Sequence, residues 1–519
     1  MAAKRFPVGL QDFAGIRSNG FFYIDKTEYI HRLVHNEGKY FFLSRPRRFG
    51  KSLLMSTIHY YFEGRKELFK GLAIERLETD WPCAPVLHFD MSLGKHMDRE
   101  QLNDYLLQQL TSEEARFGLK GTSPYPNIRL TDLIKTVYEQ TGQGVVVLID
   151  EYDAPLLDVA HEDGLLDALR NVMRNFYSPL KACDPYLRFV LLTGITKFSQ
   201  LSIFSELNNI TNISMREEYA GICGITNEEI ETQLADDVDH LAGKLNLSHE
   251  QTLEALRDYY DGYHFTWPSP DVYNPYSLLN AFSVGKLESF WFGSGTPTFL
   301  IQMMRKFHVQ PSQLGPKQAR QSAFDAPTES LRSLTPLLYQ SGYLTIKDYD
   351  PQTKLYTLDI PNREICIGLY ESLLPNYLEE MTEEGEVAIS KMSLLIRQDN
   401  MDGALHLLQD FLGTIPYCDN ARSEGHYQQM LYVVFTLLTD FLVEVEVRTA
   451  RGRIDVLLMT HTNIYVIELK LNRDAESALE QINVKDYAGR FATSTLPVTK
   501  AGVNFSTEER NITSWSIAR

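Results

Sequence analysis

Two short stretches, Ser44-Arg-Pro-Arg-Arg-Phe-Gly-Lys-Ser52 and Val145-Val-Val-Leu-Ile-Asp-Glu151, decide the fold expected for this chain of 519 residues. The first follows a short apolar run and ends in Gly-Lys-Ser, where a helical pattern begins. A strand that ends in a turn at a helix N-terminus points backbone N–H groups and a positive dipole end at an anion. The stretch therefore predicts a phosphate-binding loop, in which Lys51 reaches the β- and γ-phosphates of ATP and Ser52 binds Mg²⁺.

The loop departs from the usual G-x-x-x-x-G-K-[ST] pattern, because Arg45 stands where the first glycine is expected. Taken alone it would also fit a surface loop. The second stretch favours the nucleotide site, since an apolar strand ends there in two acids. Asp150 suits contact with Mg²⁺, directly or through water, and Glu151 suits the base that polarises the attacking water. An intervening strand, Pro85 to Phe89, predicts a P-loop NTPase sheet of the additional-strand, catalytic-glutamate type.

Other residues near these stretches have more than one interpretation. Thr193 ends the next apolar strand and suits a sensor of the γ-phosphate, or equally a strand-end hydroxyl in a turn. Arg47 and Arg48 could bind phosphate, contact a neighbouring subunit or be solvated. His88 fits a strand residue better than a ligand. The residues expected to bind the nucleotide are Arg47, Arg48, Phe49, Gly50, Lys51, Ser52, Asp150 and Thr193.

A second group of charged residues lies in apolar strands near the C-terminus. Side chains alternate along a strand, so Glu468 and Lys470 project to one face, and Asp455 lies near the start of the strand before them. Two neighbouring carboxylates suit Mg²⁺ or Mn²⁺, while the lysine can orient a water or offset phosphate charge. The alternative is a solvent-exposed ladder of salt bridges. Glu424 and Gln481 could complete the site, although each alone would usually be a surface residue.

Composition narrows the class of protein. A formal net charge of −18 repels nucleic acid on average, so contact with DNA or RNA needs a local basic surface, and Arg448, Arg451 and Arg453 beside Asp455 are the best candidates. The five cysteines are far apart with no C-x-x-C pair, which favours reduced thiols. No secretory signal and no apolar stretch of about 20 residues is present, so we expect a cytoplasmic protein without membrane contact.

The chain is long enough for about three domains. In residues 1–210 apolar strands alternate with helical segments, which predicts a parallel sheet covered on both faces. Residues 211–396 are expected to be a mainly helical lid and linker, with a helical or winged-helix-like module. Residues 397–519 predict a compact α/β domain.

Local patterns place several elements within these parts. Two capping boxes, Thr226-Asn-Glu-Glu229 and Ser248-His-Glu-Gln251, predict helix starts in the middle region. The elements expected at the C-terminus are a helix over Gly425–Leu438, strands at Val443–Val447, Arg453–Met459 and Ile464–Lys470, and a helix from Ala475 to about Arg490.

These motifs resemble known families. Tyr23-Ile-Asp-Lys-Thr27, Ser44 to Ser52 and Leu148-Ile-Asp-Glu-Tyr-Asp153 are similar to the bacterial AAA-ATPase-like family, whose phosphate loop also carries arginine in place of the first glycine. The C-terminal part resembles the PD-(D/E)XK nuclease superfamily, which implies a restriction-endonuclease-like α/β fold.

The second resemblance implies roles for individual residues. Asp455 matches the metal-binding aspartate, and Glu468-Leu-Lys470 matches the E-x-K element. Glu424 matches the helix glutamate, and Gln481 with Tyr487 matches the motif of the following helix. The residues expected to be catalytic in the whole chain are Glu151, Glu424, Asp455, Glu468, Lys470 and Gln481, and those expected to bind metal are Ser52, Asp150, Asp455 and Glu468.

Two functions follow from these features. The leading hypothesis is an ATP-dependent or ATP-regulated nuclease that hydrolyses DNA, with RNA as an open alternative substrate and homo-oligomerisation also open. The other hypothesis is a nucleotide-switched regulator whose nuclease-like domain binds nucleic acid or a partner without cleaving. Intact metal-binding and lysine positions favour the nuclease.

Overall fold

The computed structural model describes residues 4–92, 98–157, 159, 162–197, 210–292, 298–326, 333–373, 383–413, 424–437, 442–449, 451–509 and 511–519. The chain forms two compact units. One comprises Met1–Trp291 with Lys317–Asn362, and the other comprises Phe292–Pro316 with Arg363–Arg519. The predicted division at residues 210 and 396 stays a prediction.

The first unit is built on a parallel five-stranded sheet. Its strands are β1 (Tyr40–Ser44), β2 (Val86–Asp90), β3 (Val145–Asp150), β4 (Leu187–Gly194) and β5 (Thr211–Asn212), in the order β2-β3-β4-β1-β5. This is the sheet of a P-loop NTPase of the predicted type. The strand inserted between β1 and β3 in space is β4, whereas β2, which lies between them in sequence, is at the edge.

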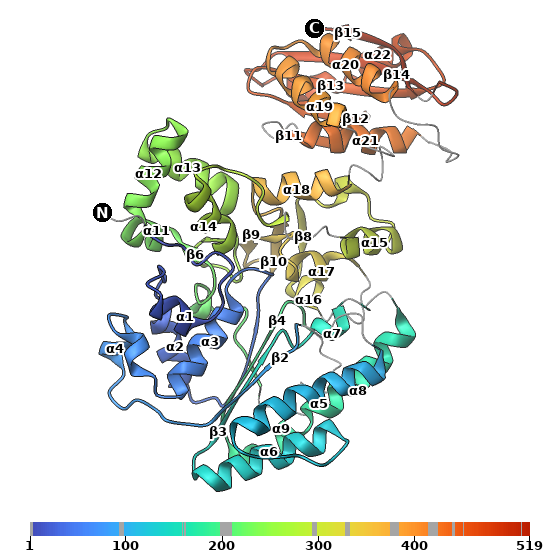
Figure 1. Cartoon of the computed structure of the whole chain (residues 1–519). Helices are drawn as coiled ribbons and strands as arrows, with labels where there is room; N and C mark the ends of the chain where they lie inside the picture. The colour runs from blue at the N-terminus through green and yellow to red at the C-terminus, as the bar shows by residue number, and fades with distance from the viewer. Residues whose placement is uncertain are drawn as a thin grey trace. The chain divides into compact units, whose positions relative to one another are not determined.

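Helices cover both faces of this sheet. Figure 1 shows α5 (Arg99–Arg116), α6 (Pro126–Thr141) and α8 (Asp163–Tyr177) grouped on one side, with α2 (Thr27–Val34) and α3 (Lys51–Phe62) on the other. Every residue of β3 is buried, because a central parallel strand is enclosed by helices on both faces. This explains why its sequence is continuously apolar until the two acids.

The middle region contributes helices and small sheets to the same unit. Its main helices are α11 (Asn227–Gln233), α12 (Ala235–Leu245), α13 (His249–Tyr260) and α14 (Pro275–Val284). Both predicted capping boxes are confirmed, since Thr226 caps α11 and Ser248 caps α13 with reciprocal side-chain bonds. The short strands β6 (Ile225–Thr226) and β7 (Val272–Tyr273) pair antiparallel, and they directly precede α11 and α14 in the chain.

A three-stranded antiparallel sheet in this region was not predicted. It consists of β8 (Lys317–Ala319), β9 (Thr345–Asp350) and β10 (Leu355–Asp359) in the order β8-β10-β9. Its strands are short and only partly buried, so they lack the continuous apolar runs of the large sheet.

The second unit contains a mixed five-stranded sheet, β11 (Leu442–Thr449), β12 (Gly452–Met459), β13 (Ile464–Leu471), β14 (Val498–Ser506) and β15 (Asn511–Ala518), in chain order. Only the β13–β14 pair is parallel. Its helices are α15 (Thr298–Lys306), α18 (Arg363–Leu373), α19 (Glu383–Arg397), α20 (Met401–Gly413), α21 (Glu424–Leu437) and α22 (Ala475–Val484).

The C-terminal prediction needs two corrections. The helix expected to reach about Arg490 ends at Val484, because Asp486 adopts a left-handed conformation with φ of 50° and a separate 3₁₀ turn, η8 (Tyr487–Phe491), follows. Strands β14 and β15 were not predicted. Among the helices that the structure describes, none combines the length and apolarity needed to cross a bilayer.

The residue after α13, Asp261, is a buried acid in the middle region. Its side chain accepts a hydrogen bond from Asn227 Nδ2 at 3.4 Å, and its backbone carbonyl accepts one from Asn362 Nδ2 at 2.8 Å. Burial raises the pKa of the Asp261 carboxyl to about 7. The folded chain therefore favours the protonated acid below about pH 7.

We expect Asp261→Asn to stabilise the protein more at pH 8 than at pH 5. The folded-state pKa lies above the ordinary value of 3.8, so the wild-type chain loses stability as the pH rises from about 4 to about 7, whereas an amide does not ionise. Melting temperatures of both proteins across this range test the expectation, with the exposed Asp348→Asn as control. A difference that stays constant with pH would contradict it.

Candidate functional site

The phosphate-binding loop follows β1 and opens α3. Gly50 has φ of 93°, a left-handed conformation that glycine adopts without strain, and a Cβ placed there would meet no atom within 4 Å. The loop is therefore open at the N-terminus of a 12-residue helix, where a phosphate would be stabilised by backbone N–H groups. Lys51 Nζ donates to the carbonyls of Arg45 and Pro46 at 3.1 and 3.2 Å, which places the ammonium across the loop.

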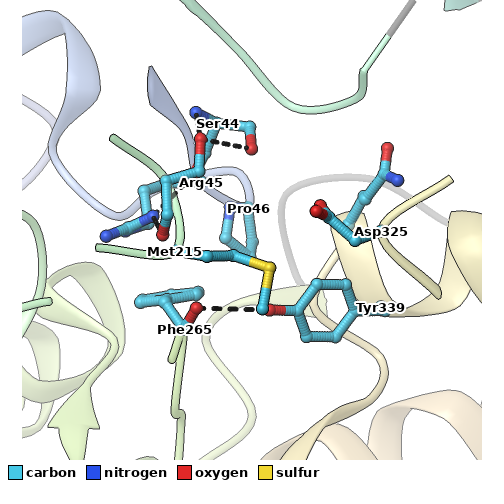
Figure 2. Close-up of a pocket in the computed structure, with 9 residues that line it drawn as sticks. Ser44, Arg45, Pro46, Met215, Phe265, Asp325 and Tyr339 are labelled. Carbon is cyan, nitrogen blue, oxygen red and sulfur yellow. Dashed lines mark hydrogen bonds between the residues drawn. The ribbon is translucent and has the colours of Figure 1, made fainter. Parts of the chain in front are cut away.

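Arg45, in place of the first glycine, points into the protein. Its side chain is 1% exposed, and Nη1 and Nη2 donate to the carbonyls of Ser214 at 2.7 Å and Tyr219 at 3.1 Å. The guanidinium lies 4.1 Å from the ring centroid of Phe265, and Figure 2 shows it beside that ring and Ser44. Burial lowers the pKa of Arg45 to about 10, so it stays charged at neutral pH. Arg45 therefore braces the loop from inside the protein and leaves the side of the loop that would face phosphate open.

The other loop residues divide between packing and solvent. Phe49 is buried against Tyr263 and Phe265, so only its backbone can face a phosphate. The guanidinium of Arg48 lies 3.9 Å from the ring centroid of Tyr276. Arg47 and Arg48 are exposed, which keeps both available to an anion or a partner.

The acids and the sensor candidate meet where β3 and β4 end. Parallel pairing aligns Asp150 with Thr193, and the threonine hydroxyl donates a hydrogen bond to Asp150 Oδ1. Glu151 has φ of 49°, and its N–H donates to Asp150 Oδ1 at 3.0 Å. Burial raises the pKa of the Glu151 carboxyl, although the nearby Lys51 ammonium lowers it. A carboxylate of raised pKa accepts a proton from water more readily.

Asp153 is a supporting residue whose role the sequence reasoning missed. Fully buried, its carboxylate accepts hydrogen bonds from the backbone N–H groups of Ile195 and Thr196 and from the Thr196 hydroxyl. A Cβ at Gly194 would lie 2.5 Å from Asp153 Oδ1, so only glycine fits there. Asp153 thereby fixes the end of β4 beside Glu151, and an acid two residues after Glu151 was the available signal.

A second site is assembled on β12, β13 and α22. Glu468 is 2% exposed, and its Oε1 accepts hydrogen bonds from Lys470 Nζ at 3.0 Å and from Gln481 Nε2. Gln481 Nε2 lies 3.5 Å from Tyr487 Oη, which in turn accepts from the N–H of Arg453 at 3.3 Å. The structure thus brings together the glutamate, lysine, glutamine and tyrosine that the sequence singled out.

Asp455 lies on the neighbouring strand, close to Glu468. The ladder between β12 and β13 pairs Val456 with Ile467, the residues adjacent in sequence to Asp455 and Glu468. Asp455 Oδ2 accepts from the N–H of Leu469 at 2.9 Å, which holds the carboxylate between the strands. Two oxygen-donor acids with a lysine beside them fit Mg²⁺ or Mn²⁺.

The helix residue expected to complete this site is not described. Glu424 begins α21, but its side chain lies outside the described residues. One turn later, Gln428 Nε2 donates to the backbone carbonyl of Asp455 at 3.0 Å. Sequence reasoning missed Gln428, although a spacing of four residues from Glu424 on a helix predicts the same face.

Three exposed arginines lie near this site, on and beside the turn between β11 and β12. Arg448, Arg451 and Arg453 all reach solvent, and Arg453 pairs with Glu446 at 3.2 Å. The Arg453 N–H that bonds Tyr487 links this surface to the carboxylate site.

The fold and the two sites define a P-loop NTPase joined to a PD-(D/E)XK-type domain. Residues 7–204 match the family model described as a predicted AAA-ATPase, and residues 422–515 match the PD-(D/E)XK nuclease superfamily. An uncharacterized protein in the vnfD 5′ region of Azotobacter chroococcum mcd 1 is 34% identical, covering 99% of this chain and 98% of that protein. The chain belongs to this family of AAA-ATPase-like proteins with a C-terminal PD-(D/E)XK domain, which confirms the resemblance.

Solved structures show only distant likeness. A chain of Drosophila ORC bound to poly(dA/dT) DNA and Cdc6 has a TM-score of 0.24 and 11% identity, covering 59% of this chain and 45% of that one. The Aeropyrum pernix ORC2 protein in ADPNP-ADP complexes has the same TM-score and identity, covering 65% and 87%. Scores at this level support no inference about the sites.

Replacing the buried arginine should loosen the phosphate-binding loop. Arg45→Met leaves the carbonyls of Ser214 and Tyr219 without these donors inside the protein, which costs on the order of 1–3 kcal/mol each. We expect a lower melting temperature and weaker ATP binding, measured by thermal unfolding and calorimetry. Arg216→Met, on the exposed side of the same segment, should change neither. An Arg45 variant with wild-type ATP affinity would contradict the bracing role.

Proposed function

We propose that this protein is an ATP-regulated, metal-dependent nuclease that hydrolyses phosphodiester bonds of DNA. The observation that carries the proposal is the Asp455, Glu468 and Lys470 constellation on adjacent strands, with Gln481 bonded to the glutamate. A chain that only binds nucleic acid has no need for a buried glutamate held by a lysine and a glutamine. The phosphate-binding loop of the same chain supports regulation by ATP.

At the nucleotide site, charged and polar side chains placed around the phosphates would hold ATP. Lys51 would leave the carbonyls of Arg45 and Pro46 and donate to the β- and γ-phosphates. Ser52 and Asp150 supply the oxygens for Mg²⁺, which neutralises phosphate charge when bound. Glu151 would accept the proton of the attacking water.

At the C-terminal site Asp455 and Glu468 would hold Mg²⁺ or Mn²⁺, which lowers the pKa of water when bound. Lys470 would orient that water or offset charge on the scissile phosphate. Gln481 would keep Glu468 in place through its amide. The exposed Arg448, Arg451 and Arg453 would contact flanking phosphates, offsetting the acidic charge of the chain.

ATP hydrolysis should depend on Lys51 and Glu151 in different ways. Lys51→Ala should lower both ATP binding and turnover, the latter by about 100-fold or more, since a cation facing the phosphates is lost. Glu151→Gln should keep ATP bound and block hydrolysis. Radiolabelled ATP binding and phosphate release measure both, and Lys66→Ala is an exposed control. Equal turnover in the wild type and the Lys51 variant would refute the nucleotide-site assignment.

The pH dependence of hydrolysis should report Glu151. Because burial raises its pKa, turnover should fall on acidification at a pH above the range of an ordinary glutamate. Turnover falls and does not rise on acidification, because Glu151 can accept a proton from water only as the ionised carboxylate.

DNA cleavage should depend on the C-terminal residues without affecting ATP hydrolysis. Asp455→Ala, Glu468→Ala and Lys470→Ala should each lower cleavage of plasmid and single-stranded DNA by roughly 100-fold or more. Only the two acid variants should also weaken Mg²⁺ or Mn²⁺ binding. Gln481→Ala should lower cleavage about 10- to 100-fold through Glu468.

Matched controls lie on the same elements. Glu480→Gln is exposed beside Gln481, and Lys485→Ala is exposed just beyond α22. Both should cleave at the wild-type rate. If the purified protein cleaves neither DNA nor RNA with any metal and nucleotide, the nuclease proposal fails and a nucleotide-switched regulator takes its place.

A further inference from the structure

A cluster of two histidines and a glutamate lies away from both sites, between α2 and α4 (Ile74–Leu77). His31 is in the last turn of α2, His35 is its C-cap residue, and Glu78 is the C-cap residue of α4. The two histidines are four residues apart, so they lie on the same side of the helix end.

The three side chains converge at one point. One ligand atom from each lies within 4.8 Å of the other two, and His35 Nε2 is 2.8 Å from Glu78 Oε2. The two imidazole rings have centroids 4.3 Å apart with their planes inclined at 45°. His35 is exposed and His31 partly exposed, so rotation of the two imidazoles toward the fixed Glu78 carboxylate would bring the three ligand atoms to a shared ion.

Neighbouring groups hold the Glu78 carboxylate in place. The Tyr61 hydroxyl donates to Glu78 Oε2, and the N–H of Asp80 donates to Glu78 Oε1 at 3.2 Å. Such bonds from outer groups fix the orientation of carboxylate ligands in metal sites.

Burial is graded across the cluster. The Glu78 side chain is 3% exposed, whereas that of His35 is 51% exposed. The anchoring carboxylate is therefore fixed inside the protein, and the imidazole side faces solvent. An ion can therefore reach the cluster from the His35 side.

We propose that His31, His35 and Glu78 form a binding site for a divalent transition metal of the Zn²⁺ class. Two imidazole nitrogens and one carboxylate, with an open fourth position, are a ligand set that zinc accepts. Mg²⁺ prefers oxygen ligands, so the site differs in kind from the two proposed magnesium sites.

The bound ion would tie the C-terminal ends of α2 and α4. Their other ends are already joined, because the N–H of Ile74 donates to the Thr27 hydroxyl at 3.1 Å. Without the ion, the His35–Glu78 contact links these ends. With the ion bound, His31, His35 and Glu78 would all be ligands of one cation. The link lies just before β1, which leads into the phosphate-binding loop.

The test uses the full chain with Asp455→Asn and Glu468→Gln, which remove the proposed oxygen ligands at the C-terminal site. Zn²⁺ binding is measured by equilibrium dialysis in excess Mg²⁺, and Co²⁺ serves as a spectroscopic probe of nitrogen ligation. We expect one Zn²⁺ per chain that Mg²⁺ does not displace, and a rise in melting temperature with Zn²⁺ concentration.

His31→Asn and His35→Asn should each weaken Zn²⁺ binding at least about tenfold and remove the visible Co²⁺ spectrum. His35 is exposed, so its variant should fold, and His240→Asn on the surface of α12 should bind like the parent protein. Unchanged affinity in both cluster variants would overturn the proposal, as would complete displacement of Zn²⁺ by Mg²⁺ or the absence of Zn²⁺ binding.

Discussion

A buried cation, the Arg45 guanidinium, connects the phosphate-binding loop to the segments around it. It donates hydrogen bonds to the carbonyls of Ser214 and Tyr219, and it lies over the ring of Phe265. Burying a charge is costly unless it is paired or hydrogen-bonded, so these partners must be in place for the loop to form. Phe49 packs against the same Phe265 ring, and Trp291 Nε1 donates to the Arg47 carbonyl at 3.2 Å, so these contacts also hold the loop.

The sequence predicted the parallel sheet and the approximate site because these rest on short-range signals. The apolar run before Asp150 indicates a strand buried on both faces, and its two acids mark the end where ligands gather. The identity of the inserted strand was not predicted. An additional-strand sheet was expected, but no local pattern specifies that β4 fills the position between β1 and β3 and sets Thr193 against Asp150.

The C-terminal site was more accessible to sequence reasoning. Asp455, Glu468 and Lys470 lie on two consecutive strands joined by a short turn. Because side chains alternate along a strand, the sequence nearly determines that these three side chains lie close together. Strands β14 and β15 were not predicted, because neither contributes a charged motif to the site that drew attention to β12 and β13. The contact of Gln428 with the Asp455 carbonyl depends on how α21 packs, which spacing alone does not determine.

The distance along the chain between Arg45 and its partners also bears on synthesis at the ribosome. Arg45 and Ser214 are separated by 169 residues. At a translation rate of about 5–20 residues per second, the partners emerge on the order of 10–30 seconds after the loop. During that interval the arginine has only the carbonyl of the adjacent Ser44 as an acceptor and lacks those of Ser214 and Tyr219, so the loop gains its full bracing only once the middle region has left the ribosome.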